Sequence, residues 1–295
     1  MSNPTIGFIG LGLMGEGITK RLMETGHAVA GYDVVPAKVT AAAARGIRAC
    51  ASPAEVARAS DIVLMSVTTT AAVEEVVTGA GGIASAGSLK GKVLADHSTT
   101  EIDTTKRVAA ALLAATDMDF VDAPVSGRPA AAAAGTLAIM AGGNEAAIAR
   151  VRPVIERLGQ LTHLGPIGAG QATKLVNQTL VLANYCVIAE ALRLAEAYGV
   201  DASKIPAALA PGHAGSNLLP VLFERMIARD FAPKGYARQI LKDLEMLHKA
   251  AGAQHLSMPM AAQALTLYRL LIAQGKSELD GAAILTLYPE PKPAE

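Results

Sequence analysis

The N-terminal stretch from residue 5 to residue 33 constrains the fold more than any other, because it has the pattern of a nucleotide-binding βαβ unit. A short apolar run, Ile6 to Ile9, predicts a buried strand that leads directly into a G-x-G-x-x-G turn. The segment Glu16 to Thr25 predicts an amphipathic helix, and Ala28 to Tyr32 predicts a second strand that ends at Asp33. The sequence therefore predicts a dinucleotide site near the start of the chain, with an ordinary glycine-rich βα turn as the alternative.

The parts of this turn have separate chemical uses. The turn consists of Gly10, Leu11, Gly12, Leu13, Met14 and Gly15. Gly10 makes the tight turn, Gly12 lets the backbone approach a pyrophosphate, and Gly15 lets the helix and strand pack closely. The helix N-terminus offers free N–H groups and a positive dipole end to phosphates. Asp33 lies where a carboxylate accepts hydrogen bonds from an adenine ribose, so we expect all seven residues to bind the cofactor.

Composition excludes several classes of partner. The 295 residues carry 26 Lys and Arg against 26 Asp and Glu, so there is no basic field for nucleic acid or for a membrane surface. Cys50 and Cys186 are far apart and form no C-x-x-C pair, so we expect neither a metal site nor a disulfide framework. The apolar stretch from Leu175 to Leu194 contains several polar residues, which favours a buried helix over a membrane span. The first strand begins almost at the N-terminus, so we expect no signal peptide and a cytoplasmic protein.

The pattern along the chain changes once. Before Leu164, strand-like runs alternate with helix-like segments, which predicts an α/β fold with an N-terminal Rossmann doubly wound sheet. The expected strands are 62–67, 92–96, 119–121, 137–141 and 161–164, and the expected helices are 71–77, 104–113 and 146–158. A long helix over 171–198 and at least four more helices follow. We expect a dinucleotide-binding domain over 1–164 and an all-helical substrate and dimerisation domain over 165–295, which begins with a long interdomain helix.

Small and hydroxyl-bearing residues follow three of the expected strands. They occupy residues 66–70, 97–100 and 122–129. Ligands of such sheets bind beyond the carboxyl ends of the strands, so these segments predict a rim for cofactor and substrate. We expect Val67, Thr68 and Thr99 to contact the cofactor. The alternative is that Ser98 or Thr99 caps the helix that begins near Ile102, with Glu101 as part of the cap.

Lys174 is the strongest candidate for acid–base chemistry. It shares one face of the long helix with Asn177 and Gln178, three and four residues further on. The rest of that helix is largely apolar, and desolvation lowers the pKa of a lysine in such a place, so that it can move a proton near neutral pH. A solvated surface lysine is the alternative. Lys242 is a second candidate, for which the alternative is a helix charge paired to a neighbour.

Four motifs carry a family resemblance. They are GFIGLGLMG at 7–15, DAPVSG at 122–127, GAGQATKLVNQ at 168–178 and KDLEM at 242–246. In this order and spacing the chain, from Ile6 to about Leu287, resembles the β-hydroxyacid dehydrogenase family, whose members include 3-hydroxyisobutyrate dehydrogenase and tartronate semialdehyde reductase. The resemblance implies that hydride passes between a nicotinamide cofactor and a small anionic β-hydroxyacid or semialdehyde. It also implies a homodimer or homotetramer.

The resemblance assigns roles to individual residues. Lys174 matches the family's catalytic acid/base. Ser126, Gly127 and Asn177 match residues that hold the carboxylate and hydroxyl of the substrate, and Lys242 matches a lysine near the nicotinamide and the substrate. Asp33, followed by Val34 and Val35 rather than by a cation, resembles the NAD-preferring branch, so we expect NAD, with NADP less favoured.

The chain departs from the family at Arg128, where a second glycine usually follows Ser126-Gly127. Glycine there would allow a positive φ, whereas arginine brings bulk and a fixed charge. Its planar fork suits a second anionic group on the substrate, so we expect Arg128 to bind substrate, with solvent or an interdomain acid as the alternative. His97 stands where methionine or cysteine is common, and we expect it to line the pocket. His213 lies in the segment that helps close the pocket in relatives.

Two other functions stay open. An imine reductase of the same fold would usually lack the lysine at position 174, and a non-catalytic dinucleotide-binding scaffold would be expected to lose that lysine or the glycine turn. The chain has both features. The residues and the resemblance therefore favour a dehydrogenase.

Overall fold

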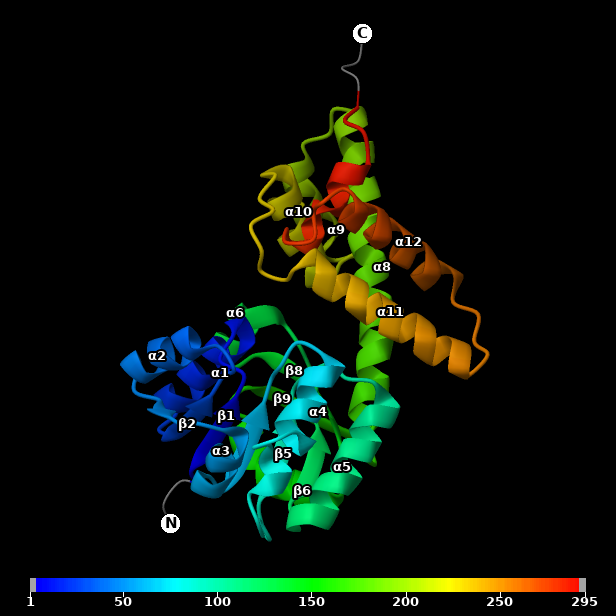
Figure 1. Ribbon diagram of the computed structural model, residues 1–295. Helices are drawn as coiled ribbons and strands as arrows, with labels where there is room; N and C mark the ends of the chain where they lie inside the picture. The colour runs from blue at the N-terminus through cyan, green and yellow to red at the C-terminus, as the bar shows by residue number, and fades with distance from the viewer. Residues whose placement is uncertain (1–3, 292–295) are drawn as a thin grey trace. The chain divides into compact units, whose positions relative to one another are not determined.

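The computed structural model describes residues 4–291. Two compact units, Met1–Lys174 and Leu175–Glu295, make up the chain. The first is built on one nine-stranded sheet, and the second consists of helices (Figure 1).

The sheet of the first unit has the strand order of a Rossmann fold. Its strands are β1 (Ile6–Ile9), β2 (Val29–Tyr32), β3 (Arg48–Ala49), β4 (Ile62–Met65), β5 (Val93–Asp96), β6 (Asp119–Asp122), β7 (Val125–Ser126), β8 (Leu137–Gly142) and β9 (Gly159–Gly165). The six strands in the order β3-β2-β1-β4-β5-β6 are all parallel. From β1 the chain adds β2 and β3 on one side and then β4, β5 and β6 on the other. Antiparallel pairing joins β8 to β6 and β7, and β9 runs parallel to β8. The expected α/β fold is confirmed.

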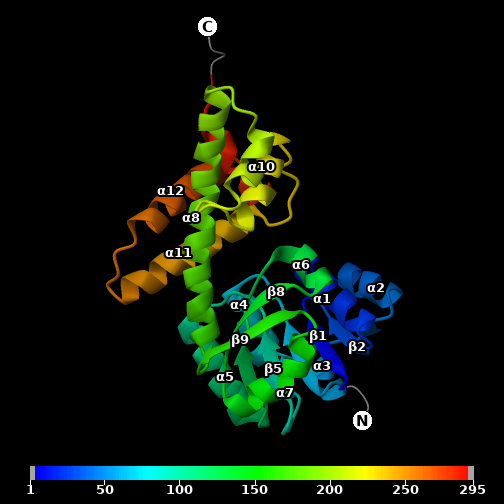
Figure 2. The same cartoon turned by 180° about the vertical axis from the view of Figure 1, so that it is seen from behind.

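Helices cover both faces of this sheet (Figures 1 and 2). They are α1 (Leu13–Glu24), α2 (Pro36–Ala44), α3 (Pro53–Ala59), α4 (Thr70–Thr78), α5 (Ile102–Thr116), α6 (Arg128–Ala134) and α7 (Glu145–Ile155), with a 3₁₀ turn at Ile83–Ser85. The strands are apolar on both sides because both faces are covered. In β4, for example, Ile62 and Leu64 pack toward α1 and α7, whereas Val63 and Met65 pack toward α3, α4 and α5.

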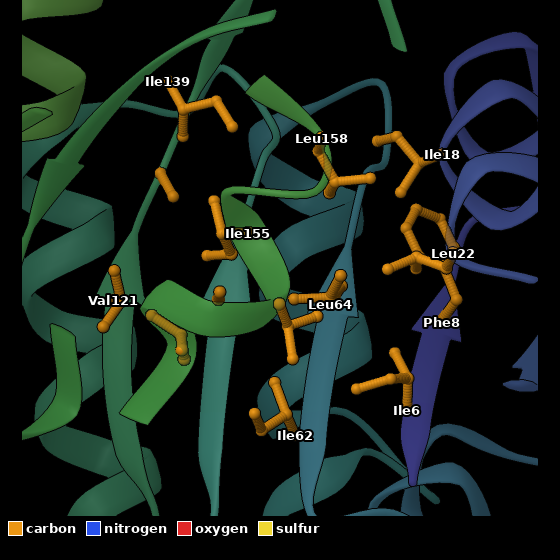
Figure 3. Packing of buried hydrophobic residues seen from close by; sticks show 14 of the residues in the cluster. Ile6, Phe8, Ile18, Leu22, Ile62, Leu64, Val121, Ile139, Ile155 and Leu158 are labelled. Atoms are coloured by element: carbon orange, nitrogen blue, oxygen red, sulfur yellow. The ribbon is translucent and has the colours of Figure 1, made fainter. Parts of the chain in front are cut away.

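The core on the face covered by α1 and α7 is continuous from β1 to α7. Ile6 and Phe8 of β1 lie in it beside Ile18 and Leu22 of α1 (Figure 3). The side chain of Ile155, at the end of α7, belongs to the same cluster. All five are essentially inaccessible to solvent, so the turn between β1 and α1 is attached to two well-packed elements.

The second unit packs helices around the 29-residue helix α8. Its elements are α8 (Ala169–Ala197) from Leu175 onward, α9 (Ile205–Leu209), α10 (Leu218–Ile227), α11 (Ala237–Ala253) and α12 (Pro259–Ala273), with 3₁₀ turns at Ala202–Lys204 and Gly281–Leu287. Buried residues recur at helical spacing in α11, as at Ile240, Leu244 and Leu247. Tyr268 of α12 and Phe223 of α10 fill the centre of this core. The expected all-helical C-terminal part is confirmed.

Several element limits differ from those expected from the sequence. Helix α1 begins at Leu13, inside the glycine turn, rather than at Glu16, because Gly12 already serves as its N-cap. Helix α7 ends at Ile155 rather than at residue 158, and β9 begins earlier, at Gly159. The two-residue strands β3 and β7 were not expected, because two residues are too short to show a period.

Helix α8 is the only helix, within residues 4–291, that is long and apolar enough to cross a membrane by length and composition. In its most apolar 18-residue window, 44% is buried inside the protein. Core helices of soluble proteins pass the same test, so this finding is weak evidence for a membrane. The first residues of α8, through Lys174, belong to the first unit.

Candidate active site

The glycine turn after β1 leaves one side of the backbone open. Gly10 has φ +98°, and a Cβ on it would lie 2.1 Å from the carbonyl oxygen of Ser66. A Cβ on Gly15 would lie 2.0 Å from the carbonyl oxygen of Gly10. By contrast, a Cβ on Gly12 would have only the Lys38 Nζ within 4 Å, at 3.8 Å. The first and third glycines are therefore required by packing, while Gly12 leaves room for a ligand to approach the backbone.

Asp33 holds the turn in place. Its Oδ2 accepts a hydrogen bond from the Leu11 N–H and its Oδ1 accepts one from the Val35 N–H, both at 2.8 Å. The carboxylate is buried, and the Nζ of the half-exposed Lys38 lies 3.6 Å from Oδ2. The acidic residue at the end of β2 thus orients the backbone of the glycine turn, and it brings a cation close to itself.

Tertiary hydrogen bonds organise the ends of β4 and β5. The Val67 N–H donates to Ser98 Oγ at 2.9 Å, and the Ser98 N–H donates to Asp96 Oδ1 at 2.8 Å. Helix α5 begins at Ile102 with Glu101 as its N-cap and no side-chain cap hydrogen bond. Glu101 is thus part of the cap, as the alternative expected. The interpretation of Ser98 as a cap is wrong, because its hydroxyl bonds the neighbouring strand end instead. Thr68 is exposed and Thr99 is half-buried on the same edge.

The carboxylate of Asp122, at the end of β6, binds the N-terminal end of α8. Its Oδ1 accepts from the Gly168 N–H and its Oδ2 accepts from the Gln171 N–H, both at 2.8 Å. These N–H groups have no partner within a helix, and the positive end of the helix dipole favours a carboxylate there. Close approach needs glycine, because a Cβ on Gly170 would lie 2.4 Å from the Met140 carbonyl oxygen. Sequence analysis placed Asp122 in the rim segment 122–129 but did not predict its bond to α8, and the residue is fully buried.

Lys174 is brought to the strand β7. Its side chain is buried, with 7% of the residue exposed, and Nζ donates to the carbonyl oxygen of Val125 at 2.7 Å. This burial excludes the solvated surface lysine. Ser126 and Gly127 follow Val125 directly, so the structure brings Lys174 together with the segment expected to hold substrate.

The segment after β7 has an unusual backbone. Gly127 has φ +139° and Arg128, the first residue of α6, has φ +69°. A residue with a Cβ is disfavoured by about 1–2 kcal/mol in the left-handed region, where glycine is unstrained. The departure from the family at Arg128 is therefore a strained one. The Arg128 side chain is half-buried.

A chain of polar side chains joins α8 to α11 within the second unit. The Asn177 Nδ2 donates to Gln178 Oε1 at 2.9 Å, and the Gln178 Nε2 donates to Asp243 Oδ2. The Lys242 Nζ lies 2.9 Å from Asp243 Oδ1. Lys242 is thus paired with its neighbour and oriented by it. This ion pair is the alternative stated for Lys242. Asp243 lies in the motif KDLEM, but its bond to Gln178 was not predicted.

Burial shifts the pKa values of three groups behind this edge. Desolvation raises the pKa of Asp96 to about 7 and that of Asp122 to about 6, and it lowers the pKa of His97 to about 4. The His97 Nδ1 lies 2.7 Å from the Ala123 carbonyl oxygen and donates to it, since a carbonyl only accepts. The neutral His97 is buried, and its place in a pocket lining stays a prediction. His213 is exposed, between α9 and α10.

Two family models together match nearly the whole chain. The NAD binding domain of 6-phosphogluconate dehydrogenase matches residues 5–170. A model described as the NAD-binding part of NADP-dependent 3-hydroxyisobutyrate dehydrogenase matches residues 168–288. Among the described residues, no group of His, Cys, Asp and Glu side chains could hold a metal ion.

Curated relatives match over nearly their full length. The 2-hydroxy-3-oxopropionate reductase of Escherichia coli (strain K12) is 38% identical over 281 residues, which are 95% of each chain. The 2-(hydroxymethyl)glutarate dehydrogenase of Eubacterium barkeri is 35% identical over 288 residues, 97% of this chain and 95% of the relative.

Solved structures agree with these relatives. The 3-hydroxyisobutyrate dehydrogenase of Mycobacterium tuberculosis, solved with L-serine, has a TM-score of 0.84 and 30% identity, covering 98% of this chain and all of that one. An imine reductase from Pseudomonas sp. has a TM-score of 0.65 and 21% identity over 97% of this chain and 99% of that one, which shows a common fold alone.

The raised pKa of Asp96 predicts a pH-dependent stability. A carboxyl whose folded pKa lies above its unfolded value makes the native state hold more protons between about pH 4 and pH 7, so its contribution to stability falls as the pH rises. His97, with its lowered pKa, acts in the opposite direction below about pH 6.5. We therefore compare Asp96→Asn with the native protein. The unfolding free energy of Asp96→Asn minus that of the native protein should rise by about 1 kcal/mol or more as the pH is raised from 5 to 8. Denaturant titrations of both proteins at each pH measure this difference.

Asp61→Asn is the matched control. The Asp61 carboxylate accepts hydrogen bonds from the Thr5 N–H and hydroxyl, and the first of these holds its pKa below the usual range. A lowered pKa gives stability that is lost only in acid, so the difference between Asp61→Asn and the native protein should stay constant from pH 5 to pH 8. Parallel pH profiles for Asp96→Asn and the native protein would contradict the assignment of Asp96.

Proposed function

The chain belongs to the β-hydroxyacid dehydrogenase family, and we propose that Lys174 is its acid/base in a reaction that interconverts a small β-hydroxyacid and the matching semialdehyde. The protein is an NAD(P)-dependent oxidoreductase, as its named relatives are. The observation that carries the role of Lys174 is its buried amine, held 2.7 Å from the Val125 carbonyl oxygen beside Ser126 and Gly127.

The glycine turn fits a nicotinamide dinucleotide. The open side of Gly12 leaves room for a pyrophosphate, and α1 begins there with its N–H groups free of a side-chain cap. When bound, the cofactor supplies the carbon that accepts or gives the hydride. We infer that the residues expected from the sequence hold it, namely Gly10, Leu11, Gly12, Leu13, Met14, Gly15, Asp33, Val67, Thr68, Thr99 and Lys242.

The chain's own residues then bind, orient and exchange a proton. Ser126 and Gly127 hold the carboxylate end of the substrate, and Asn177 and Lys242 are further substrate-binding residues, as the family resemblance implies. Lys174 Nζ gives a proton to the aldehyde oxygen during reduction and takes it from the hydroxyl during oxidation. The division expected from the sequence, with the dinucleotide bound by residues 1–164 and substrate binding and dimerisation by 165–295, is part of this proposal.

The two alternatives lose support. The relatives are named as dehydrogenases and reductases of β-hydroxyacids, which argues against the hypothesis of a non-catalytic scaffold protein. Imine reductases are more distant than these relatives, and the lysine at position 174 favours hydroxyacid chemistry. Bacterial dehydrogenases among the relatives support a soluble protein. The cytoplasmic location remains a proposal, and the balanced charge is the support for expecting no nucleic-acid or membrane partner.

One face of α8 supports a homodimer or homotetramer. Exposed apolar side chains recur on that face at intervals of four and seven residues. They are Val176, Leu180, Val187, Leu194 and Tyr198. An exposed apolar stripe of this length marks a protein interface, and soluble oligomers are mostly symmetric assemblies of one chain. This stripe also explains why α8 is as apolar as a membrane span.

Removal of the Lys174 amine tests the proposed function directly. Lys174→Ala should lower kcat by about 100-fold or more, because a positioned acid/base contributes about 10²–10⁴-fold. The Kd for NADH, measured by fluorescence titration, should hardly change. Retention of most of kcat would remove Lys174 from the mechanism.

The carboxylate of Asp33 predicts a preference for NAD. It repels a 2′-phosphate, so kcat/KM should be about tenfold higher with NAD than with NADP, or about 1.4 kcal/mol. Asp33→Ser should narrow the gap. The Lys38 ammonium, 3.6 Å from Asp33 Oδ2, offsets part of this repulsion, so Lys38→Ala should widen it. Equal kcat/KM for both cofactors in the native enzyme would refute the preference.

Arg128 bears on the choice of substrate. We infer that its guanidinium binds a second anionic group, as one relative is named for a dicarboxylic acid, 2-(hydroxymethyl)glutarate. Arg128→Gly should lower kcat/KM for 2-(hydroxymethyl)glutarate about 10–100-fold, which corresponds to a loss of about 1.5–3 kcal/mol of interaction with the substrate. It should leave 3-hydroxyisobutyrate unchanged or improve it. Arg128→Lys keeps the charge but not the fork and should lie between the two. An equal response of both substrates would mean that Arg128 does not recognise the substrate.

A further inference from the structure

Gln171 is the first buried side chain of α8 and the mechanism does not use it. Only 1% of the residue is exposed. Its Oε1 accepts from the Thr100 N–H at 3.0 Å, and its Nε2 donates to the Ser98 carbonyl oxygen at 2.8 Å. Both polar atoms of one buried amide are therefore paired with the backbone of one short loop, which follows β5.

The same loop is bonded to the neighbouring strand end. The Ser98 hydroxyl accepts from the Val67 N–H at 2.9 Å, just after β4. Val67 and Thr99 are among the residues proposed to contact the cofactor. The side chain of Gln171 thus connects α8 to two strand ends at the edge where the dinucleotide is proposed to bind.

Lys174 lies one turn beyond Gln171 on the same helix. The start of that turn is fixed by Asp122, whose Oδ2 accepts from the Gln171 N–H at 2.8 Å. The rotation of α8 about its own axis is fixed by the Gln171 side chain, because both polar atoms of this amide are bonded to the loop after β5. These contacts together set the direction in which Lys174 projects toward Val125.

We propose that Gln171 is a positioning residue, which holds the Lys174 amine in register with the strand ends that bind the cofactor. The inference rests on the proposed function, in which Lys174 exchanges the proton. Gln171 itself touches neither substrate nor cofactor. It acts by joining the helix that carries the acid/base to the loop that carries the cofactor contacts, and pre-organisation of this kind is worth much in catalysis because small displacements of reacting groups are costly.

The first test replaces the amide without changing its length. Gln171→Met should lower kcat at least tenfold at a temperature well below its unfolding transition, with a smaller change in KM. Thr173→Ala is the matched control, because the Thr173 hydroxyl bonds only the Ala169 carbonyl oxygen of its own helix, at 2.8 Å. The control should keep kcat within about twofold. A Gln171→Met enzyme that is less heat-stable but keeps its kcat would overturn the proposal.

A double variant separates this inference from the proposed function. If Gln171 acts through Lys174, the enzyme with both Gln171→Met and Lys174→Ala should be no slower than Lys174→Ala alone. If the two losses multiply, Gln171 does not act through the lysine and the inference fails. If Lys174→Ala alone keeps its activity, the proposed function fails, whatever Gln171 does.

Gln171→Glu gives a readout that a purely structural role would not produce. The ionised carboxylate would face the Ser98 carbonyl oxygen without a donor, whereas the protonated form would donate to it and still accept from the Thr100 N–H. The ratio of variant to native kcat for aldehyde reduction should therefore rise as the pH falls from 8 to 5.5. Asp96 and Asp122 titrate in both enzymes, so the ratio removes their effects. A flat ratio would overturn the proposal, and this measurement decides it if Gln171→Met does not fold.

Discussion

The site depends on the contact between the Asp122 carboxylate and the first turn of α8. This carboxylate pairs two N–H groups that no residue of the helix can satisfy, and it does so with no exposure to water. The burial is unfavourable for a charge, as the raised pKa of Asp122 indicates. The helix dipole and the close approach at Gly170 offset that cost, and they fix where the helix starts. The position of Lys174 follows from that start.

Sequence patterns predicted the parts of the fold that local chemistry determines. The glycine turn, the strand at Ile6 to Ile9 and the change from alternating elements to helices all depend on neighbours in the chain. The cap assigned to Ser98 failed for the opposite reason. A hydroxyl that could have capped its own helix bonds Val67, 31 residues away, because the strand end offers a buried N–H that needs a partner.

The polar groups that organise the site were hidden from sequence reasoning by distance along the chain. Gln171 and Ser98 are 73 residues apart, and Gln178 and Asp243 are 65 apart. Nothing in the residue types distinguishes these amides from solvated ones. Lys174 and Asn177 could be singled out because the resemblance and the helical spacing both pointed to them. Asp122, Gln171 and Asp243 lie inside the same motifs, but the motifs do not show which distant groups they bind.

Arg128 has a consequence at the level of the gene. Its backbone lies at φ +69°, where glycine would be unstrained. Every arginine codon becomes a glycine codon by a single base change, so the relaxed residue is one mutational step away. One base change is therefore enough to replace Arg128 with glycine and to relieve the backbone strain at this position. In the role proposed for Arg128, the same step would replace a charged substrate contact with a neutral one, so a single codon would couple substrate range to the relief of backbone strain.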